Sequence, residues 1–244
     1  MQDIELSSAQ SVIAKLLDEY RYNGQIIGRE FPIIFNGEFF EVIFVCPEQD
    51  SLSERYNNEA VNEAFENLSL QGLSLPEFEV KGLESHSDFT DLCHEPTALV
   101  IYSTFVQSCS PVRCLEHFSP VPLYKLPEQT RKSLVKWQES YGACDQLQMN
   151  EVQQIEQGAV QQLSESNSDL MLQAQKLADD IEANLKTPVY RYLYRVGGDS
   201  LAEEQARKCP SCHGEWLLEQ PLHDLFDFKC DACGLLSNIS WDWQ

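Results

Sequence analysis

A pair of Cys-x-x-Cys motifs near the C-terminus constrains the fold of this chain more than any other feature. Cys209 and Cys212 form the first pair, and Cys230 and Cys233 form the second after 17 intervening residues. Each pair can wrap a tight turn around one side of a tetrahedral ion, so that four thiolates close the coordination sphere. The spacing predicts one structural zinc ion with no open position for water. An iron centre with the same ligands, a redox thiol pair and buried cysteines without metal are the alternatives.

Three short β-rich runs predict the rest of a zinc ribbon over residues 209–244. They cover residues 216–218, 225–229 and 239–243. A chain below about 40 residues rarely folds without disulfides, a bound metal or oligomerisation. Structural zinc contributes about 10–16 kcal/mol to folding in small finger peptides. We therefore expect a ribbon with almost no core, folded when the metal is bound.

Residues 1–108 mix helix and strand patterns without a regular β-α repeat, which predicts an α+β domain. Asn36-Gly37 separates two β-rich runs and is the preferred turn of a β-hairpin. The elements predicted in this domain are helices at about 7–22 and 58–70 and strands at 31–35, 38–45, 78–80 and 98–106.

The middle of the chain predicts a connector, a helical region and a strand. Prolines punctuate residues 109–127, which is typical of an extended connector between domains. Residues 128–187 carry three amphipathic patterns, which predict a three-helix layer or bundle. Residues 188–208 begin as a strand and continue into a short helix that Ser200 opens with a capping box. The predicted class is α+β, with an N-terminal mixed domain, a helical middle region and a C-terminal four-cysteine zinc ribbon.

The strongly acidic composition of the chain disfavours non-specific electrostatic binding to nucleic acid. The formal net charge is −22, and residues 209–244 hold six Asp and Glu against Lys229 alone. No signal-peptide pattern and no run of about 18 apolar residues is present. We expect a soluble cytoplasmic protein with no membrane contact. The five cysteines outside the pairs are then reduced thiols: Cys46, Cys93, Cys109, Cys114 and Cys144.

A second metal site is a weaker hypothesis, carried by Cys109, Cys114 and His117. Cys114 and His117 are separated by the two-residue gap of a metal knuckle, and thiolate with imidazole is a normal zinc set. The alternative is a group of scattered buried cysteines and a surface histidine.

Arginine, tyrosine and tryptophan side chains in the last third of the chain are candidate contacts for nucleic acid or a partner protein. Such side chains stack on bases and pair with phosphates. The candidates are Arg191, Tyr192, Arg195, Trp216, Trp241 and Trp243. The alternative is a half-buried strand whose arginines pair with nearby carboxylates, with tryptophans that pack against the knuckles.

No phosphate-binding loop, metalloprotease helix, nucleophile elbow or dinucleotide-binding fingerprint occurs in the sequence. The sequence therefore favours a non-enzymatic protein.

The segment 225–243 resembles an uncharacterised bacterial family of zinc-ribbon-containing proteins with a suggested nucleic-acid-binding role. The segments 110–114, 120–124 and 190–195 also resemble the sequences of this family. The resemblance implies one zinc ion held by Cys209, Cys212, Cys230 and Cys233.

Two functions compete at this point. The ribbon and the resemblance favour a zinc-binding protein that contacts nucleic acid, whereas the net charge favours an acidic adaptor between proteins. A thiol or zinc sensor, or an enzyme without a recognisable motif, is a further alternative.

Overall fold

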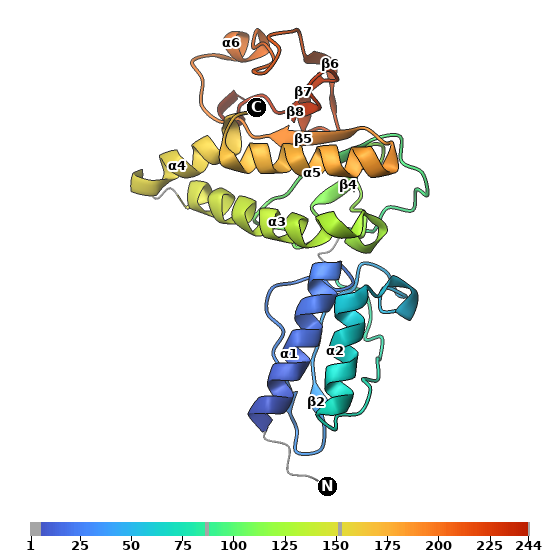
Figure 1. The fold of residues 1–244 in the computed structure, drawn as a ribbon. Helices are drawn as coiled ribbons and strands as arrows, with labels where there is room; N and C mark the ends of the chain where they lie inside the picture. The colour runs from blue at the N-terminus through green and yellow to red at the C-terminus, as the bar shows by residue number, and fades with distance from the viewer. Residues whose placement is uncertain (1–5, 86–87, 151–152, 244) are drawn as a thin grey trace.

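The computed structural model describes residues 6–85, 88–150 and 153–243, and it confirms the α+β class. Figure 1 shows an N-terminal unit of two helices and a hairpin at one end of the molecule. A larger unit, which contains the main sheet, three long helices and the four cysteines, lies at the other end. Within the described ranges, no helix has the length and apolar character needed to cross a membrane.

The N-terminal unit is built on two packed helices, α1 (Leu6–Asn23) and α2 (Glu59–Leu70). Asn58 caps α2 by accepting a hydrogen bond from the backbone N–H of Val61, as its residue type favours. The turn at Asn36-Gly37 joins β1 (Ile34–Phe35) to β2 (Phe40–Glu41), so the predicted hairpin forms with strands of only two residues. A 3₁₀ turn, η1 (Glu54–Tyr56), precedes α2. The run 78–80, predicted as a strand, has no strand pairing and its side chains are exposed.

The larger unit is organised around a six-stranded mixed sheet in the order β4-β3-β5-β8-β7-β6. Its parallel pairs are β3–β5 and β5–β8, and its other neighbours are antiparallel. The strands are β3 (Leu99–Ile101), β4 (Val112–Cys114), β5 (Val189–Leu193), β6 (Leu217–Leu222), β7 (Phe226–Cys230) and β8 (Leu235–Ser237). Every residue of β3, β4, β5 and β8 is buried, which suits strands covered on both faces.

The stretch 109–127, predicted as a connector, is instead part of this unit. It forms β4, which pairs with β3, and the 3₁₀ turn η2 (Leu123–Lys125). Val112 and Cys114 are completely buried, as core residues are and linker residues are not. The prolines here mark turns between short elements, which a sequence pattern does not distinguish from an extended linker.

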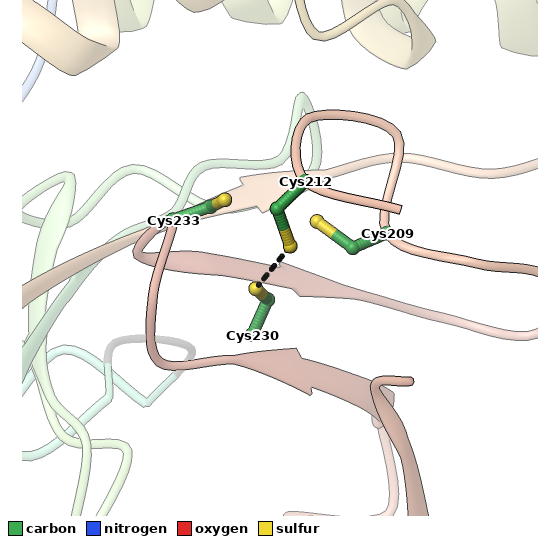
Figure 2. Close-up of side chains that lie close together, drawn as sticks. All are labelled: Cys209, Cys212, Cys230 and Cys233. Atoms are coloured by element: carbon green, nitrogen blue, oxygen red, sulfur yellow. Dashed lines mark hydrogen bonds between the residues drawn. The ribbon is translucent and has the colours of Figure 1, made fainter. Parts of the chain in front are cut away.

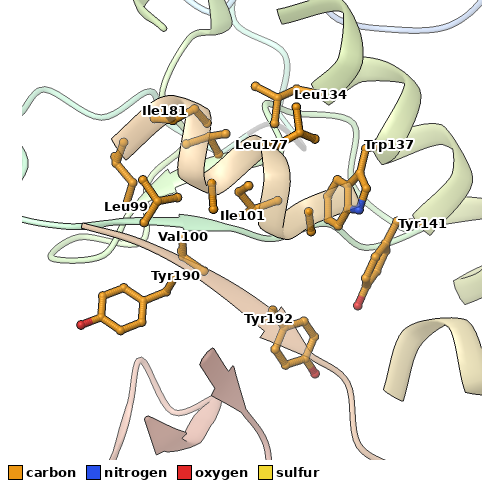
Figure 3. Close-up of a cluster of buried hydrophobic side chains, with 14 of the residues drawn as sticks. Leu99, Val100, Ile101, Leu134, Trp137, Tyr141, Leu177, Ile181, Tyr190 and Tyr192 are labelled. Carbon is orange, nitrogen blue, oxygen red and sulfur yellow. The ribbon is translucent and has the colours of Figure 1, made fainter. Parts of the chain in front are cut away.

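Three helices follow β4 in the chain: α3 (Glu128–Met149), α4 (Gln153–Ser164) and α5 (Asp169–Leu185). Of these, α5 packs on β5. Figure 3 shows Leu134, Trp137 and Tyr141 of α3 beside α5 and the strands. The helix α3 continues through Gly142, because the tertiary packing on α4 and α5 outweighs the glycine penalty. Ser168 caps α5 through the backbone N–H of Met171.

The C-terminal ribbon is continuous with the main sheet. Its strand β8 lies between β5 and β7, whereas the third ribbon strand was predicted at residues 239–243. That stretch contains the 3₁₀ turn η3 (Trp241–Trp243) instead. Phe226 and Leu236 belong to the central core, so the ribbon shares a core that the sequence did not predict. The short helix α6 (Leu201–Gln205) leads from β5 to the first cysteine pair, and Ser200 caps it as predicted.

The two units meet where the C-terminal end of α1 contacts η2 and α3. Gly24 has a φ of +81°, and a Cβ atom on it would lie 2.3 Å from the Cβ of Leu123. Arg21 forms an ion pair with Glu139 of α3. Arg131 donates a hydrogen bond of 2.6 Å to the side-chain oxygen of Asn23. Close backbone approach and buried polar contacts thus fix the junction.

Candidate metal centres

The first cysteine pair lies on a tight turn between α6 and β6. The backbone N–H of His213 donates to the carbonyl of Cys209 at 2.8 Å, and the N–H of Cys209 donates to the carbonyl of Gly214 at 3.0 Å. His213 takes a left-handed φ of +60° to close this turn. These contacts place the thiols of Cys209 and Cys212 on the same side of the turn.

The second pair lies on the turn between β7 and β8. Cys230 is the last residue of β7, and Cys233 precedes Gly234, whose φ is +58°. A Cβ atom on Gly234 would lie 3.2 Å from the carbonyl oxygen of Val189, so glycine also allows the close approach of β5. The turn therefore belongs both to the cysteine site and to the sheet.

The four thiols converge on one point, as Figure 2 shows. Their sulfur atoms all lie within 4.8 Å of one another, and the sulfurs of Cys212 and Cys230 are 3.6 Å apart. A tetrahedral zinc ion with Zn–S bonds of about 2.3 Å requires sulfur separations of about 3.8 Å. All four cysteines are free thiols. The geometry fits a metal ion such as zinc held by Cys209, Cys212, Cys230 and Cys233.

The electrostatics of this cluster also favour a cation. The backbone N–H of Gly214, helped by the neighbouring thiols, lowers the pKa of Cys212 to about 7. Burial and the neighbouring thiols raise the pKa of Cys233 to about 12. Four thiols this close cannot all ionise without a positive charge between them. A divalent cation would supply that charge and deprotonate all four.

Two contacts from β5 support the second cysteine turn. The buried guanidinium of Arg191 donates to the carbonyl oxygen of Cys233 at 2.7 Å. The hydroxyl of Tyr190 donates to the carboxylate of Asp231 at 2.7 Å. Four thiolates around a divalent ion would carry two units of negative charge, and the Arg191 cation beside Cys233 would offset one of them.

The structure separates the predicted contact residues into buried and exposed groups. Arg191, Tyr192 and Trp216 are buried, and the Tyr192 hydroxyl donates to Asn238 at 3.0 Å. The strand pattern did not distinguish a half-exposed strand from the fully covered one that is present. Trp241 and Trp243 keep 46% and 38% of their surface exposed.

Arg195 and Trp216 each contact a residue of the α6 segment, which is defined here as residues 201–207. The side chain of Arg195 forms an ion pair with the buried carboxylate of Glu204. The indole N–H of Trp216 donates to the carbonyl oxygen of Arg207 at 2.9 Å. Both side chains therefore connect the α6 segment to the structure around it.

A second cluster contains Cys114 and His117, but its third member is Asp91 and not Cys109. Arg113 and Cys114 are neighbours on β4, so their side chains point to opposite faces of the strand. The thiol of Cys109 lies on the Arg113 face, 3.1 Å from the guanidinium nitrogen. Asp91 comes from a distant extended segment, and no local spacing in the sequence identifies it.

Comparisons with known proteins place this chain among uncharacterised relatives. Three domains of unknown function match in succession: DUF8589 at residues 1–82, DUF2310 at 93–194 and DUF8594 at 198–243. An "Uncharacterized protein" of Haemophilus influenzae is 42% identical over 245 residues, covering 98% of this chain and 94% of the relative. The chain belongs to this uncharacterised family.

A second "Uncharacterized protein" of the same organism is also a member of the family. It is 44% identical over 180 residues, which cover 72% of this chain and 88% of the relative. No solved structure gives a significant match.

Proposed function

We propose that this protein is a zinc-binding, non-enzymatic adaptor that holds an apolar and basic segment of a partner protein. The observation that carries the proposal is a large groove beside the N-terminal unit. The groove has a volume of about 2120 Å³ and runs from the β1–β2 hairpin to the side of α3. Small-molecule pockets usually measure about 300–1,000 Å³, so this groove has the size for a polypeptide segment.

The lining of the groove is mostly apolar and contains more acidic than basic side chains. Lining side chains that keep half or more of their surface exposed include Phe39, Ile43, Phe78, Val80 and Phe89. Such a concentration of exposed apolar side chains is typical of an interaction surface. Eight Asp and Glu residues contribute to the lining against three Lys and Arg residues. Charge complementarity therefore favours a partner segment that carries both apolar and basic side chains.

The distribution of positive charge supports a protein partner over nucleic acid. Within the part of the chain that the structure describes, ten of the 17 Lys and Arg side chains form ion pairs with carboxylates. Arg191 is buried beneath the cysteine cluster. A phosphate backbone would have to displace these partners and approach a protein of net charge −22.

The four-cysteine centre has a structural role in this proposal. An all-thiolate tetrahedral set suits zinc and closes the coordination sphere. Loading zinc would fix the two turns that carry β6, β7 and β8. The nine free cysteines support a reducing compartment, which is consistent with the cytoplasm.

Site-specific photocrosslinking in cells tests the partner. A photoreactive phenylalanine analogue at Phe39 should give a discrete adduct that protease removes and nuclease does not. Leu172 is a matched control, because it is about half exposed on α5 and lies outside the groove lining. The crosslinked peptide should contain apolar and basic residues, and Glu41→Lys with Glu79→Lys should reduce the adduct. Equal adducts at both positions, or an acidic peptide at Phe39, would refute the groove as the binding site.

Fluorescence polarisation against labelled DNA and RNA tests the competing nucleic-acid function. We expect no saturable binding between about 50 and 200 mM salt. Saturable binding with a steep salt dependence would replace the adaptor by a nucleic-acid-binding protein, and the partly exposed Trp241 and Trp243 would then be the first side chains to substitute.

A further inference from the structure

The ligand-type side chains of Asp91, Cys114 and His117 meet on the opposite face of β4 from Arg113. One carboxylate oxygen, the Cys114 sulfur and a His117 ring nitrogen all lie within 4.8 Å of one another. We propose that these three residues form a second metal site, distinct from the four-cysteine centre, which holds a divalent transition metal of the zinc type.

The interatomic distances match those of a coordination sphere. The Nδ1 atom of His117 lies 3.0 Å from Oδ1 of Asp91 and 3.8 Å from the sulfur of Cys114. Zinc bonds of about 2.0–2.3 Å at tetrahedral angles require about 3.3 Å between nitrogen and oxygen and about 3.6 Å between nitrogen and sulfur. Shifts of a few tenths of an ångström would therefore admit the ion.

The hydrogen bonds of the cluster leave a buried acceptor for a cation to satisfy. The side chain of Asp91 is 2% exposed. Its second oxygen, Oδ2, is buried and has no hydrogen-bond partner among the residues that the structure describes. A buried carboxylate oxygen without a donor is costly, and a metal ion bound by both carboxylate oxygens of Asp91 would satisfy it.

The geometry also argues against a catalytic triad made from the same three residue types. In a triad, the acid and the nucleophile contact opposite nitrogens of the histidine ring. Here Asp91 and Cys114 both face the Nδ1 atom of His117. Three ligand atoms that converge on one point fit a shared ion better than a proton relay.

The fold holds this arrangement rigidly and leaves one side open. The backbone N–H of Cys114 donates to Ser119, and that of Phe118 donates to Cys114, which closes the turn that carries His117. The N–H of Asp91 donates to the carbonyl oxygen of Pro120, which ties the segment before β3 to the same turn. His117 keeps 57% of its side chain exposed, so an ion can enter from solvent. Three protein ligands leave a fourth position for water, the arrangement of open zinc sites.

Metal content of the full chain tests the proposal. Protein dialysed against excess zinc chloride and then gel-filtered should carry about two zinc ions per chain by mass spectrometry. His117→Ala should carry about one, because the exposed imidazole can be removed without disturbing the core. Cys109→Ser is the matched control and should retain two. One ion per chain in the wild type, or equal contents in the wild type and His117→Ala, would overturn the second site.

Cobalt substitution assigns the ligands independently of stoichiometry. The spectrum of cobalt-loaded wild type minus that of cobalt-loaded His117→Ala isolates the second site and should contain a thiolate-to-cobalt charge-transfer band. This band should be missing when Cys114→Ser replaces the wild type in the comparison. Asp91→Asn should weaken cobalt binding at this site more than the about 10- to 100-fold typical for loss of a supporting hydrogen bond. A difference spectrum that Cys114→Ser leaves unchanged would exclude Cys114 as a ligand.

Discussion

Glu204 is the buried acid that holds α6 to the rest of the C-terminal region. Its carboxylate accepts hydrogen bonds of 2.9 and 3.1 Å from Nε of Arg195 and lies 3.5 Å from Arg207. Breaking a buried ion pair on one side typically costs about 3–5 kcal/mol. We predict that Glu204→Gln lowers the free energy of unfolding by about 3 kcal/mol at pH 7, measured by urea denaturation.

The effect of Glu204→Gln should also depend on pH. Burial alone would raise the pKa of Glu204, but the hydrogen bond and charges of Arg195 and Arg207 outweigh it and hold the pKa below its usual 4.5. The carboxylate therefore stabilises the fold above pH 4.5, and this contribution is lost as the pH falls through the lower folded-state pKa. The stability gap between wild type and variant should narrow on acidification. The exposed neighbour variant Glu203→Gln should show neither effect, and a gap independent of pH would contradict the argument.

Arg191 supports the cysteine centre from below, and its substitution should weaken metal binding. We predict that Arg191→Met lowers zinc affinity about 10- to 100-fold, because it removes the hydrogen bond to Cys233 and the charge that offsets the thiolates. Competition with a zinc-chelating dye measures this change. Lys176→Met, on the exposed face of α5, is the control. An unchanged affinity in Arg191→Met would show that the arginine serves only the sheet.

At the residue scale, the sequence predicted ligands that share a local motif and missed those that do not. The four cysteines were found because two short spacings encode both halves of the site. Asp91 was missed because it joins Cys114 and His117 only through the folded segment before β3. The burial of Arg191 was missed because strand alternation does not show that both faces are covered.

At the scale of elements, loss of the metal should loosen the ribbon unevenly. Cys212→Ser changes an exposed thiol and removes one of the four candidate metal ligands. We predict that backbone amides of β6 and β7 then lose hydrogen-exchange protection, whereas β3 keeps it. The reason is that β3 is held by β4, β5 and the helices, whereas the outer ribbon strands depend on the two turns that carry the cysteines.

Strand β8 should behave differently from its ribbon neighbours in the same experiment. Leu236 packs in the central core and β8 pairs with β5, so its amides should lose less protection than those of β7. Equal loss along β6, β7 and β8 would indicate that the ribbon folds as a separate unit.

The sequence located most helices and the hairpin turn, because these carry local caps and turn residues. It could not locate β8, because parallel pairing with β5 is a long-range contact without a local signature.

At the scale of the whole molecule, the junction between the two units depends on a glycine. Gly24 has no space for a Cβ atom, which would meet Leu123 at 2.3 Å. Gly37 also has a positive φ, but nothing lies within 4 Å of its missing Cβ. Both alanine variants carry backbone strain, and only Gly24→Ala adds a clash. We predict that Gly24→Ala destabilises the protein by about 1–3 kcal/mol more than Gly37→Ala, measured by thermal unfolding.

Limited proteolysis provides a second measure of the junction. Gly24→Ala should expose η2 and the start of α3 to cleavage, whereas Gly37→Ala should not. Equal stability of the two variants would show that Leu123 moves aside without cost. The sequence could not predict this junction, since it placed residues 109–127 in an extended connector and gave no sign that α1 docks there.

The position of β8 between β5 and β7 has a consequence for how the protein is synthesised. When the ribosome has released β3, β4 and β5, the outer edge of β5 has no partner until residues 235–237 emerge. An unpaired apolar strand edge is an aggregation hazard. Chains shortened before β8 should therefore accumulate as insoluble or rapidly degraded material.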